Sequence, residues 1–449
     1  MRSPPRSTRS TVVTPRSAVS ERSPRTLLAR PPLRAGRATP QAALLLACVV
    51  TLLVLGLLMS FSASFVRATA ELGDPFGIAR RQVLWALVGV GIGWLLARAD
   101  HRILARWSGP LVAGALVLCL LLFIPGLGLE GGGARRWLAI GPVTMQPSEV
   151  LKLAVPLYLA TVLGRRADRV RAGDVHALLM PALPLLVVAF ALVVVQPDLE
   201  TAGLVAGIGG VVLLVAGLPA RLAVLGGSAV VAAAVTFIAG VGWRRDRVDA
   251  WLDPAADAGN LGYQSVQGYL ALASGGLTGT GLGESRAKWL YLPNADTDFI
   301  FAIIGEELGF LGALLVVALY SGLAIAGIRT ARAAPDTYGR LLATGITAWL
   351  LMQASMNIGS VVGLLPVTGV TLPLVSVGGT SLVVTLAGCG VLLSVARAAR
   401  PPEPEPGSDG RASGSAPASP RDTGSVRRAR RTTPDRARDP RTARHHDDH

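Results

Sequence analysis

Apolar runs of membrane-spanning length recur along nearly the whole middle of this chain. Each run is long enough to cross the roughly 30 Å of hydrocarbon in a bilayer. Only 16% of the 449 residues are charged, against about a quarter in soluble proteins. The sequence therefore predicts an all-α, polytopic membrane protein with about ten transmembrane helices. The predicted spans are 41–64, 82–98, 109–125, 147–164, 178–197, 200–217, 221–240, 299–328, 340–365 and 373–397.

Arginine-rich connections predict the orientation of these spans. The segments 98–108, 165–177 and 329–340 are basic, and so are both ends of the chain. With ten spans, all of these segments lie on one side of the membrane, and the positive-inside rule makes that side cytoplasmic. An odd number of spans would place one arginine-rich tail outside. Both termini are therefore predicted to be cytoplasmic.

The tails differ in composition from the middle of the chain. Residues 1–40 and 398–449 are rich in Arg, Pro, Ser and Thr and are predicted to be disordered. Between them, a transmembrane domain over 41–397 includes a large outer loop at 241–298. The formal net charge of +15 is typical of nucleic-acid-binding proteins. However, topology and contact with anionic membrane lipids explain basic tails beside membrane helices, so no nucleic-acid partner is expected.

Two charged residues occur at the start of the fourth predicted span. Glu149 and Lys152 follow Pro147, and their i, i+3 spacing puts them on one helix face, where they can pair. A charge within the membrane usually faces the protein interior or an aqueous cavity and marks a functional site. A structural salt bridge near the interface is the alternative.

Asp298 stands directly before the eighth predicted span. One interpretation is helix capping, with Thr297 as the cap and the carboxylate interacting with the helix dipole. The other is that a carboxylate at the mouth of an outer cavity takes a proton from a hydroxyl nucleophile. Further along this span, at least one of Glu306 and Glu307 needs a partner, because both lie in apolar sequence.

The outer loops carry positive charge against the topological bias. Arg135 and Arg136 lie in the glycine-rich loop 126–146, and Lys288 lies in the loop 241–298. Either an anionic substrate or ion pairs with neighbouring aspartates would explain them. The glycine runs lack a phosphate-binding-loop pattern, and irregular backbone that lines a cavity fits them better.

Several motifs together resemble one known family. They are Gly133-Ala-Arg135-Arg136-Trp137-Leu-Ala-Ile-Gly141, Gln146-Pro-Ser-Glu149-x-x-Lys152, Gln196-Pro-Asp198 with Thr201, Gly262-Tyr-Gln264-x-x-Gln267, Ser274-Gly-Gly276-x-x-Gly279-x-Gly281-Leu-Gly283-x-Ser285, Leu292-Pro through Gly305-Glu306-Glu307-Leu308-Gly309, Gly363-Leu-Leu-Pro366-Val-Thr-Gly369 and Ser376-x-Gly378-Gly379. In this order over 41–397, they are similar to the SEDS family, which includes FtsW, RodA and SpoVE and has ten spans.

Within that family, one stretch is most similar to the division branch, FtsW. It comprises Met59-Ser60-x-Ser62-Ala63-Ser64, Gly73-Asp74-Pro75-Phe76 and Arg81-Gln82-x-x-Trp85. The elongation branch, RodA, is the close alternative. The chain departs from the family pattern Pro-Glu-Ala-His-Thr-Asp, since it has Pro293-Asn294-Ala295-Asp296-Thr297-Asp298. The aspartate at the catalytic position is kept.

The resemblance implies a peptidoglycan glycosyltransferase that acts on lipid II. A sugar hydroxyl attacks the anomeric carbon with inversion, and undecaprenyl pyrophosphate leaves. Asp298 would be the general base. Cations would stabilise the leaving group, and Glu149 would hold one of them. The candidate substrate-binding residues are Arg81, Arg135, Arg136, Glu149, Lys152 and Lys288. No cofactor is certain. A divalent cation such as Mg²⁺ would suit the pyrophosphate, although the sequence shows no dedicated ligand set.

The resemblance also implies a class B penicillin-binding protein as partner, other divisome proteins, and a location in the plasma membrane at the septum. Two functions compete with catalysis. A lipid II flippase would place charges near the midplane and contain an inverted repeat, whereas the charges here lie at outer helix ends. A divisome scaffold without catalysis would not need Asp298, Glu149 or Lys152.

Overall fold

The computed structural model describes residues 39–399, except 132, 133, 142, 241, 261 and 290. The predicted disordered tails lie outside the described residues. Among these residues, the helices are α1 (Pro40–Leu72), α2 (Gly77–Arg98), α3 (His101–Leu121), α4 (Pro147–Arg165), α5 (Ala167–Arg171), α6 (Val175–Val195), α7 (Leu199–Ala216), α8 (Ala220–Ala239), α9 (Gly242–Leu252), α10 (Tyr263–Ser274), α11 (Ile300–Ala333), α12 (Thr337–Val361) and α13 (Gly379–Ala398).

Long helices account for each of the ten predicted spans. Seven described helices are long and apolar enough to cross a membrane: α1, α3, α6, α7, α11, α12 and α13. The other three predicted spans correspond to α2, α4 and α8. Charged residues lower the hydropathy of α2 and α4, among them Arg81 and Lys152, and α8 contains the apolar stretch Ala220–Thr236. The prediction of an all-α, polytopic membrane protein is confirmed.

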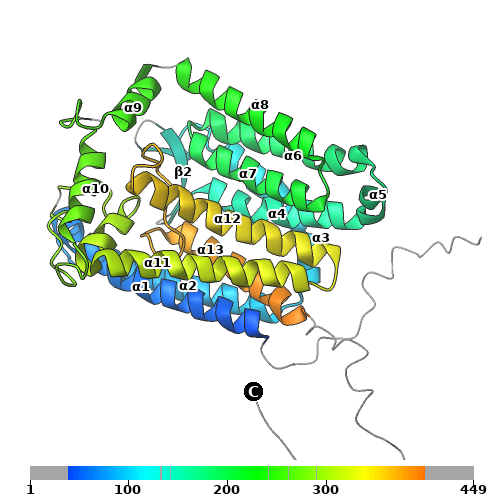
Figure 1. Cartoon of the computed structure of the whole chain (residues 1–449), viewed down its shortest axis with the longest axis horizontal. Helices are drawn as coiled ribbons and strands as arrows, with labels where there is room; N and C mark the ends of the chain where they lie inside the picture. The colour runs from blue at the N-terminus through cyan, green and yellow to red at the C-terminus, as the bar shows by residue number, and fades with distance from the viewer. Residues whose placement is uncertain are drawn as a thin grey trace, which may run out of the picture. The chain divides into compact units, whose positions relative to one another are not determined.

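The long helices run side by side, and the shorter elements gather at the ends of the bundle (Figure 1). The sheet, α9 and α10 lie at one end, and α5 lies at the other. Contacts at the α5 end join the connections that the sequence predicts to be cytoplasmic. Arg171 donates to the Thr337 hydroxyl at 3.0 Å, and Arg102 pairs with Asp336 at 2.9 Å. These contacts place the three basic connections at one end of the bundle, as the sequence predicts.

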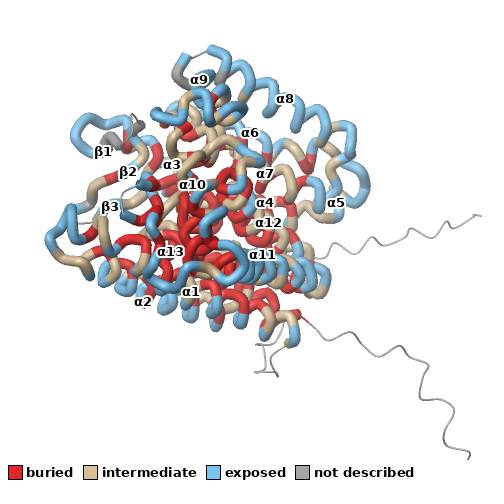
Figure 2. Tube along the Cα trace, turned by 60° about the vertical axis from the view of Figure 1, so that its left-hand side comes forward, coloured by how far each residue is buried: buried red, intermediate tan, exposed pale blue. Residues whose placement is uncertain are grey.

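Helix α4 is the most enclosed element of the bundle. Most of its residues are buried, on all sides of the helix, against neighbours that include α3, α7 and α12. Figure 2 shows the buried residues in the interior and the exposed ones around the outside. Many exposed side chains on the outer helices are large and apolar, such as Leu87, Trp94 and Val224. Contiguous apolar surface of this kind suits contact with lipid.

The predicted glycine-rich loop 126–146 folds as a small antiparallel sheet. Strands β1 (Gly128–Gly131), β2 (Ala134–Ile140) and β3 (Val143–Met145) pair in the order β1-β2-β3. Successive residues of a strand point to opposite faces. Arg136 and Leu138 therefore share one face of β2, and Arg135 lies on the other.

Helix α11 has a kink at Gly309, where φ is 70°. A side chain at this position would collide with the backbone, because a Cβ would lie 2.3 Å from the Gly279 nitrogen. The glycine-rich segment before α11 pairs with this kink. The backbone N–H groups of Thr280 and Gly281 donate to the carbonyls of Glu306 and Glu307 at 2.9 and 3.1 Å. The glycine run thus satisfies carbonyls of α11 at the kink.

Candidate active site

Asp298 lies at the same end of the bundle as the sheet, directly before α11, and two segments, α12 and residues 376–377, hold the backbone of 296–298. The Asn357 side chain on α12 donates to the Asp298 carbonyl oxygen at 2.8 Å. The Ser376 hydroxyl donates to the Thr297 carbonyl oxygen at 2.6 Å, and the Val377 N–H donates to that of Asp296 at 2.9 Å. Segments that are far apart in sequence therefore fix the position of Asp298.

The prediction that Thr297 caps α11 is wrong. Helix α11 has Phe299 at its N-cap, with no side-chain cap. The Thr297 hydroxyl donates to the carbonyl oxygen of Asn294 and does not cap the helix. No described residue donates a hydrogen bond to the Asp298 carboxylate, so its oxygens are available to a ligand.

The Asp298 carboxylate faces Arg136 across Gly369. A Cβ on this exposed glycine would lie 3.9 Å from both Asp298 Oδ2 and Arg136 Nη1. The pKa of Asp298 is raised to about 7, mainly by burial and then by the nearby carboxylates of Asp296 and Glu200, while Arg136 lowers it. A carboxyl group with such a pKa exchanges its proton near neutral pH, which suits a general base.

Arg136 is held in place from strand β2. Its guanidinium donates to the carbonyl oxygen of Pro197, in the turn before α7. The next residue, Asp198, caps α7 by accepting from the Thr201 N–H at 3.1 Å, and it also accepts from Gln146 at 3.2 Å. The Gln196-Pro197-Asp198 motif therefore positions the arginine opposite Asp298. Arg135 is exposed, on the other face of β2.

Glu149 and Lys152 form a buried ion pair inside the bundle. The Lys152 Nζ lies 2.8 Å from both Glu149 carboxylate oxygens, and the lysine is 1% exposed. It also donates to Gln353 Oε1 at 2.8 Å, and Gln353 Nε2 donates to the Thr371 carbonyl oxygen at 2.9 Å. Through Gln353, the pair therefore supports the Thr371 backbone from within the core. A direct contact with substrate stays a prediction.

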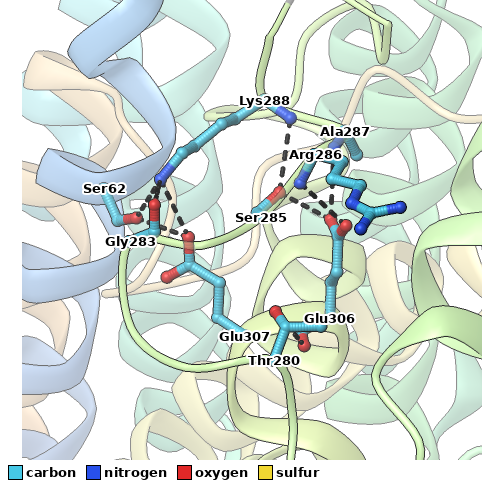
Figure 3. Close-up of polar contacts among 9 residues, drawn as sticks. All are labelled: Ser62, Thr280, Gly283, Ser285, Arg286, Ala287, Lys288, Glu306 and Glu307. Atoms are coloured by element: carbon cyan, nitrogen blue, oxygen red, sulfur yellow. Dashed lines mark hydrogen bonds and ion pairs between the residues drawn. The ribbon is translucent and has the colours of Figure 1, made fainter.

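Lys288 is enclosed by partners in a second buried cluster (Figure 3). Its Nζ lies 3.3 Å from Glu307 Oε1 and from the Ser62 hydroxyl of α1, and it donates to the Gly283 carbonyl. The neighbouring Glu306 accepts from the Ser285 hydroxyl at 2.5 Å and from the Arg286 N–H at 2.9 Å. The prediction that at least one of Glu306 and Glu307 has a partner is confirmed, since both do. Lys288 ties the loop before Asp298 to α1 and α11, and its contact with substrate stays a prediction.

Arg81 lies near the start of α2 and is exposed. Its neighbour Gln82 has a clear structural role, because it accepts from the Gly378 N–H and donates to the Ser376 carbonyl, both at 3.2 Å. Sequence reasoning missed Gln82, Gln353 and Asn357. The available signal was that each is an amide in an apolar helix, where its polar groups need protein partners.

The described residues contain no group of three or more His, Cys, Asp or Glu side chains that would hold a metal ion. Two carboxylates, of Asp298 and Glu200, nevertheless lie near each other at the site. Mg²⁺ commonly binds through one or two carboxylates together with substrate phosphates. A divalent cation at the pyrophosphate therefore stays a prediction.

Fold and site together define a multi-pass membrane protein with an acid and a guanidinium facing each other at one end of its helix bundle. The model of the cell cycle protein family FtsW, RodA and SpoVE matches residues 42–401. The chain belongs to this family, which confirms the resemblance in the sequence.

Similar proteins carry names that agree with the predicted activity. The probable peptidoglycan glycosyltransferase FtsW of Mycobacterium tuberculosis is 42% identical over 367 residues, which are 81% of this chain and 69% of that protein. Stage V sporulation protein E of Bacillus subtilis is 41% identical over 363 residues, 79% of this chain and 97% of that protein. A solved chain from a peptidoglycan synthase complex that coordinates polymerization and crosslinking has a TM-score of 0.63, at 32% identity. The match covers 79% of this chain and 96% of that one.

Proposed function

We propose that this protein is a peptidoglycan glycosyltransferase that polymerises lipid II into glycan strands, with inversion at the anomeric carbon and release of undecaprenyl pyrophosphate. The observation that supports it most is the partly exposed Asp298 carboxylate opposite Arg136 at one end of the helix bundle. A substrate with a polyprenyl tail explains why the site lies at the end of a membrane bundle. Its sugars project beyond the hydrocarbon, and its tail stays within it.

Asp298 acts as the general base in this proposal. The attacking sugar hydroxyl becomes more acidic as its oxygen bonds to the anomeric carbon, and a positioned carboxylate takes the proton as that bond forms. The pKa of about 7 leaves much of Asp298 ionised at neutral pH. Asn357 holds the Asp298 carbonyl and Ser376 holds that of Thr297, and these two hydrogen bonds fix the backbone that carries the carboxylate.

Arg136 is the best placed of the six candidate substrate-binding residues. Negative charge grows on the pyrophosphate as the glycosidic carbon–oxygen bond breaks, so a fixed cation stabilises the transition state more than the ground state. Arg135 and Arg81 are exposed, and their contact with the substrate stays a prediction. Lys152 and Lys288 are buried with partners of their own, so we assign them mainly to support of the site.

The proposal includes a place in division. The resemblance to FtsW favours septal synthesis, although the matched family contains RodA as well. We propose a class B penicillin-binding protein as the partner that crosslinks the product, by analogy with the solved synthase complex. A divalent cation such as Mg²⁺ would neutralise the pyrophosphate, and removal of free cations with EDTA tests this part of the proposal.

The test of the function is polymerisation of purified lipid II by the purified protein, with its cognate penicillin-binding protein, in detergent micelles. Micelles have no two sides, so a flippase or a scaffold makes no polymer in them. Long glycan chains from the wild-type protein support the proposal. An intact complex that leaves lipid II unchanged, while a known glycosyltransferase polymerises the same preparation, contradicts it.

A further inference from the structure

Gly369 is an exposed glycine that lies between the acid and the guanidinium of the site. A Cβ at this position would lie 3.9 Å from Asp298 Oδ2 and 3.9 Å from Arg136 Nη1. Apart from its chain neighbours, no other described atom would lie within 4 Å of this Cβ. The two charged atoms are therefore no more than twice 3.9 Å apart. A side chain at 369 would enter the space between the proposed base and the cation.

The described part of the chain does not need a glycine at this position. The φ of Gly369 lies outside the left-handed region, and 3.9 Å is an ordinary van der Waals separation, so an alanine would fit without strain. Gly363, in the same loop, is different, because its φ is 83° and a Cβ would lie 2.5 Å from the Tyr269 hydroxyl. Packing therefore explains the glycine at 363 but not the one at 369.

The chain on both sides of Gly369 is held in place. Thr368 is 7% exposed and donates to the Ser360 hydroxyl at 3.4 Å. Val370 is 6% exposed, and its carbonyl oxygen accepts from Asn357 Nδ2 at 2.8 Å. The exposed glycine thus sits on a fixed backbone between two buried residues. A rigid backbone beside the acid and the cation suits a site that positions a reactant.

We propose that the space over Gly369 admits the sugar hydroxyl that attacks the anomeric carbon, so that the missing side chain determines the size of the group that reaches Asp298. The hydroxyl gives its proton to Asp298 while its oxygen bonds to the anomeric carbon. The bond from that carbon to the pyrophosphate breaks, and its electron pair leaves with the pyrophosphate, beside Arg136. These approaches need about 3 Å between heavy atoms, so a side chain at 369 competes with the reacting atoms for space. This inference rests on the proposed function.

Substitutions of increasing size at 369 test the proposal in the complex with the cognate penicillin-binding protein. Gly369→Ala should lower kcat/KM for lipid II polymerisation about tenfold and Gly369→Leu at least about 10²-fold, since a 1 Å displacement of reactants has a cost of this size. The melting temperature should stay unchanged, because the added side chains extend into open space. Equal rates for the wild-type protein and Gly369→Leu would overturn the inference.

Gly259→Ala and Gly259→Leu are the matched controls. Gly259 is an exposed glycine of the outer loop, and no described atom lies within 4 Å of an added Cβ. Its φ also lies outside the left-handed region. These two variants should polymerise lipid II at the wild-type rate.

A thiol at the same position tests the proposal on one folded protein. The native cysteines Cys48, Cys119 and Cys389 are buried, so a polar thiol reagent reacts mainly with the exposed thiol of Gly369→Cys. Methanethiosulfonate reagents of increasing size should lower polymerisation progressively, and dithiothreitol should restore it. Gly259→Cys should keep its activity after the same treatment. Full activity of Gly369→Cys after reaction with the largest reagent would overturn the inference.

Protection of this thiol by lipid II separates the inference from the proposed function. Gly369→Cys/Asp298→Asn should bind lipid II without polymerising it, and labelled lipid II retained on the immobilised protein measures this binding. At a lipid II concentration about ten times Kd, the thiol should react about tenfold more slowly, whereas that of Gly259→Cys/Asp298→Asn should be unaffected. Protection, together with a wild-type protein that makes no polymer, would contradict the proposed function and support a substrate over Gly369. Full reactivity with lipid II bound would overturn the inference, whatever the activity shows.

Discussion

The Asn357 side chain reaches the backbone of Asp298, to whose carbonyl oxygen it donates a hydrogen bond of 2.8 Å. The same Nδ2 donates to the Val370 carbonyl, also at 2.8 Å. One buried amide on α12 thus joins the loop that carries the acid to the loop that carries Gly369, beside Arg136. The separation of base and cation depends on this amide.

We therefore expect Asn357→Ala to lower kcat at least tenfold with little change in KM. The loss leaves two buried carbonyls unpaired, at a cost of about 1–3 kcal/mol each, and lets the two loops separate. Steady-state polymerisation kinetics measure this effect. Thr344→Ala removes an exposed hydroxyl from the same helix and should have no effect. A rise in KM alone would mean that Asn357 contacts substrate.

The activity should also depend on the ionisation of Asp298. Because its pKa is raised to about 7, the rate should fall as the pH is lowered below about 7, following one ionisation. Rates measured on the same lipid II preparation over a range of pH test this. A flat profile down to about pH 5, well below this pKa, would contradict the role of Asp298 as the base.

The same ionisation affects stability. Asp298 has an ordinary pKa of 3.8, so in the folded protein it holds its proton more tightly than in the unfolded chain. The stability that the protonated acid gives at low pH is lost as the pH rises through about 7. Asp298→Asn should therefore raise the melting temperature at about pH 8 and leave it unchanged at about pH 4. Equal melting curves at both values would contradict this account.

Variants of Lys152 distinguish a structural role of this lysine from a direct contact with the substrate. Lys152→Met leaves Glu149 buried without its partner, and we expect a loss of about 3–5 kcal/mol in stability. Glu149→Gln/Lys152→Met removes both charges and should recover much of that loss. Thermal unfolding and polymerisation are measured together. A double variant that is stable and inactive would show that the lysine acts on the substrate.

Lys288 should affect catalysis by holding the loop before Asp298 in place. Lys288→Met removes the contacts to Ser62 and Glu307 that tie this loop to α1 and α11. Hydrogen exchange should become faster over 275–298, with a fall in kcat. Glu307→Gln/Lys288→Met should restore part of the protection. Unchanged exchange together with a raised KM would instead place Lys288 against the substrate.

The fold follows from the sequence because long apolar runs leave few alternatives in a membrane. The helix ends are less predictable. Helix α1 continues to Leu72, beyond the predicted end at 64, since its last turns lie outside the apolar run. Helix α13 starts at Gly379, not 373, because residues 376 and 377 are used to hold the Asp298 loop.

Sequence reasoning predicted the charged residues of the site and missed the neutral amides that hold its loops in place. Asp298 and Arg136 are charged residues at outer positions, and the structure brings them together. Asn357 and Gln353 carry no charge, and their importance comes from the carbonyls that they reach. Those partners lie in loops whose course depends on the tertiary fold. The sequence pattern of α12 alone therefore does not identify Asn357 and Gln353 as site residues.

The most direct test of the central claim compares lipid II polymerisation by the wild-type protein, Asp298→Asn and Asp253→Asn, each in complex with the cognate penicillin-binding protein. Asp253 is an exposed carboxylate in the same outer loop, so it controls for loss of a negative charge. The account predicts that Asp298→Asn folds and assembles normally but polymerises at least about 10²-fold more slowly, while Asp253→Asn retains activity. Normal polymerisation by Asp298→Asn would contradict the account.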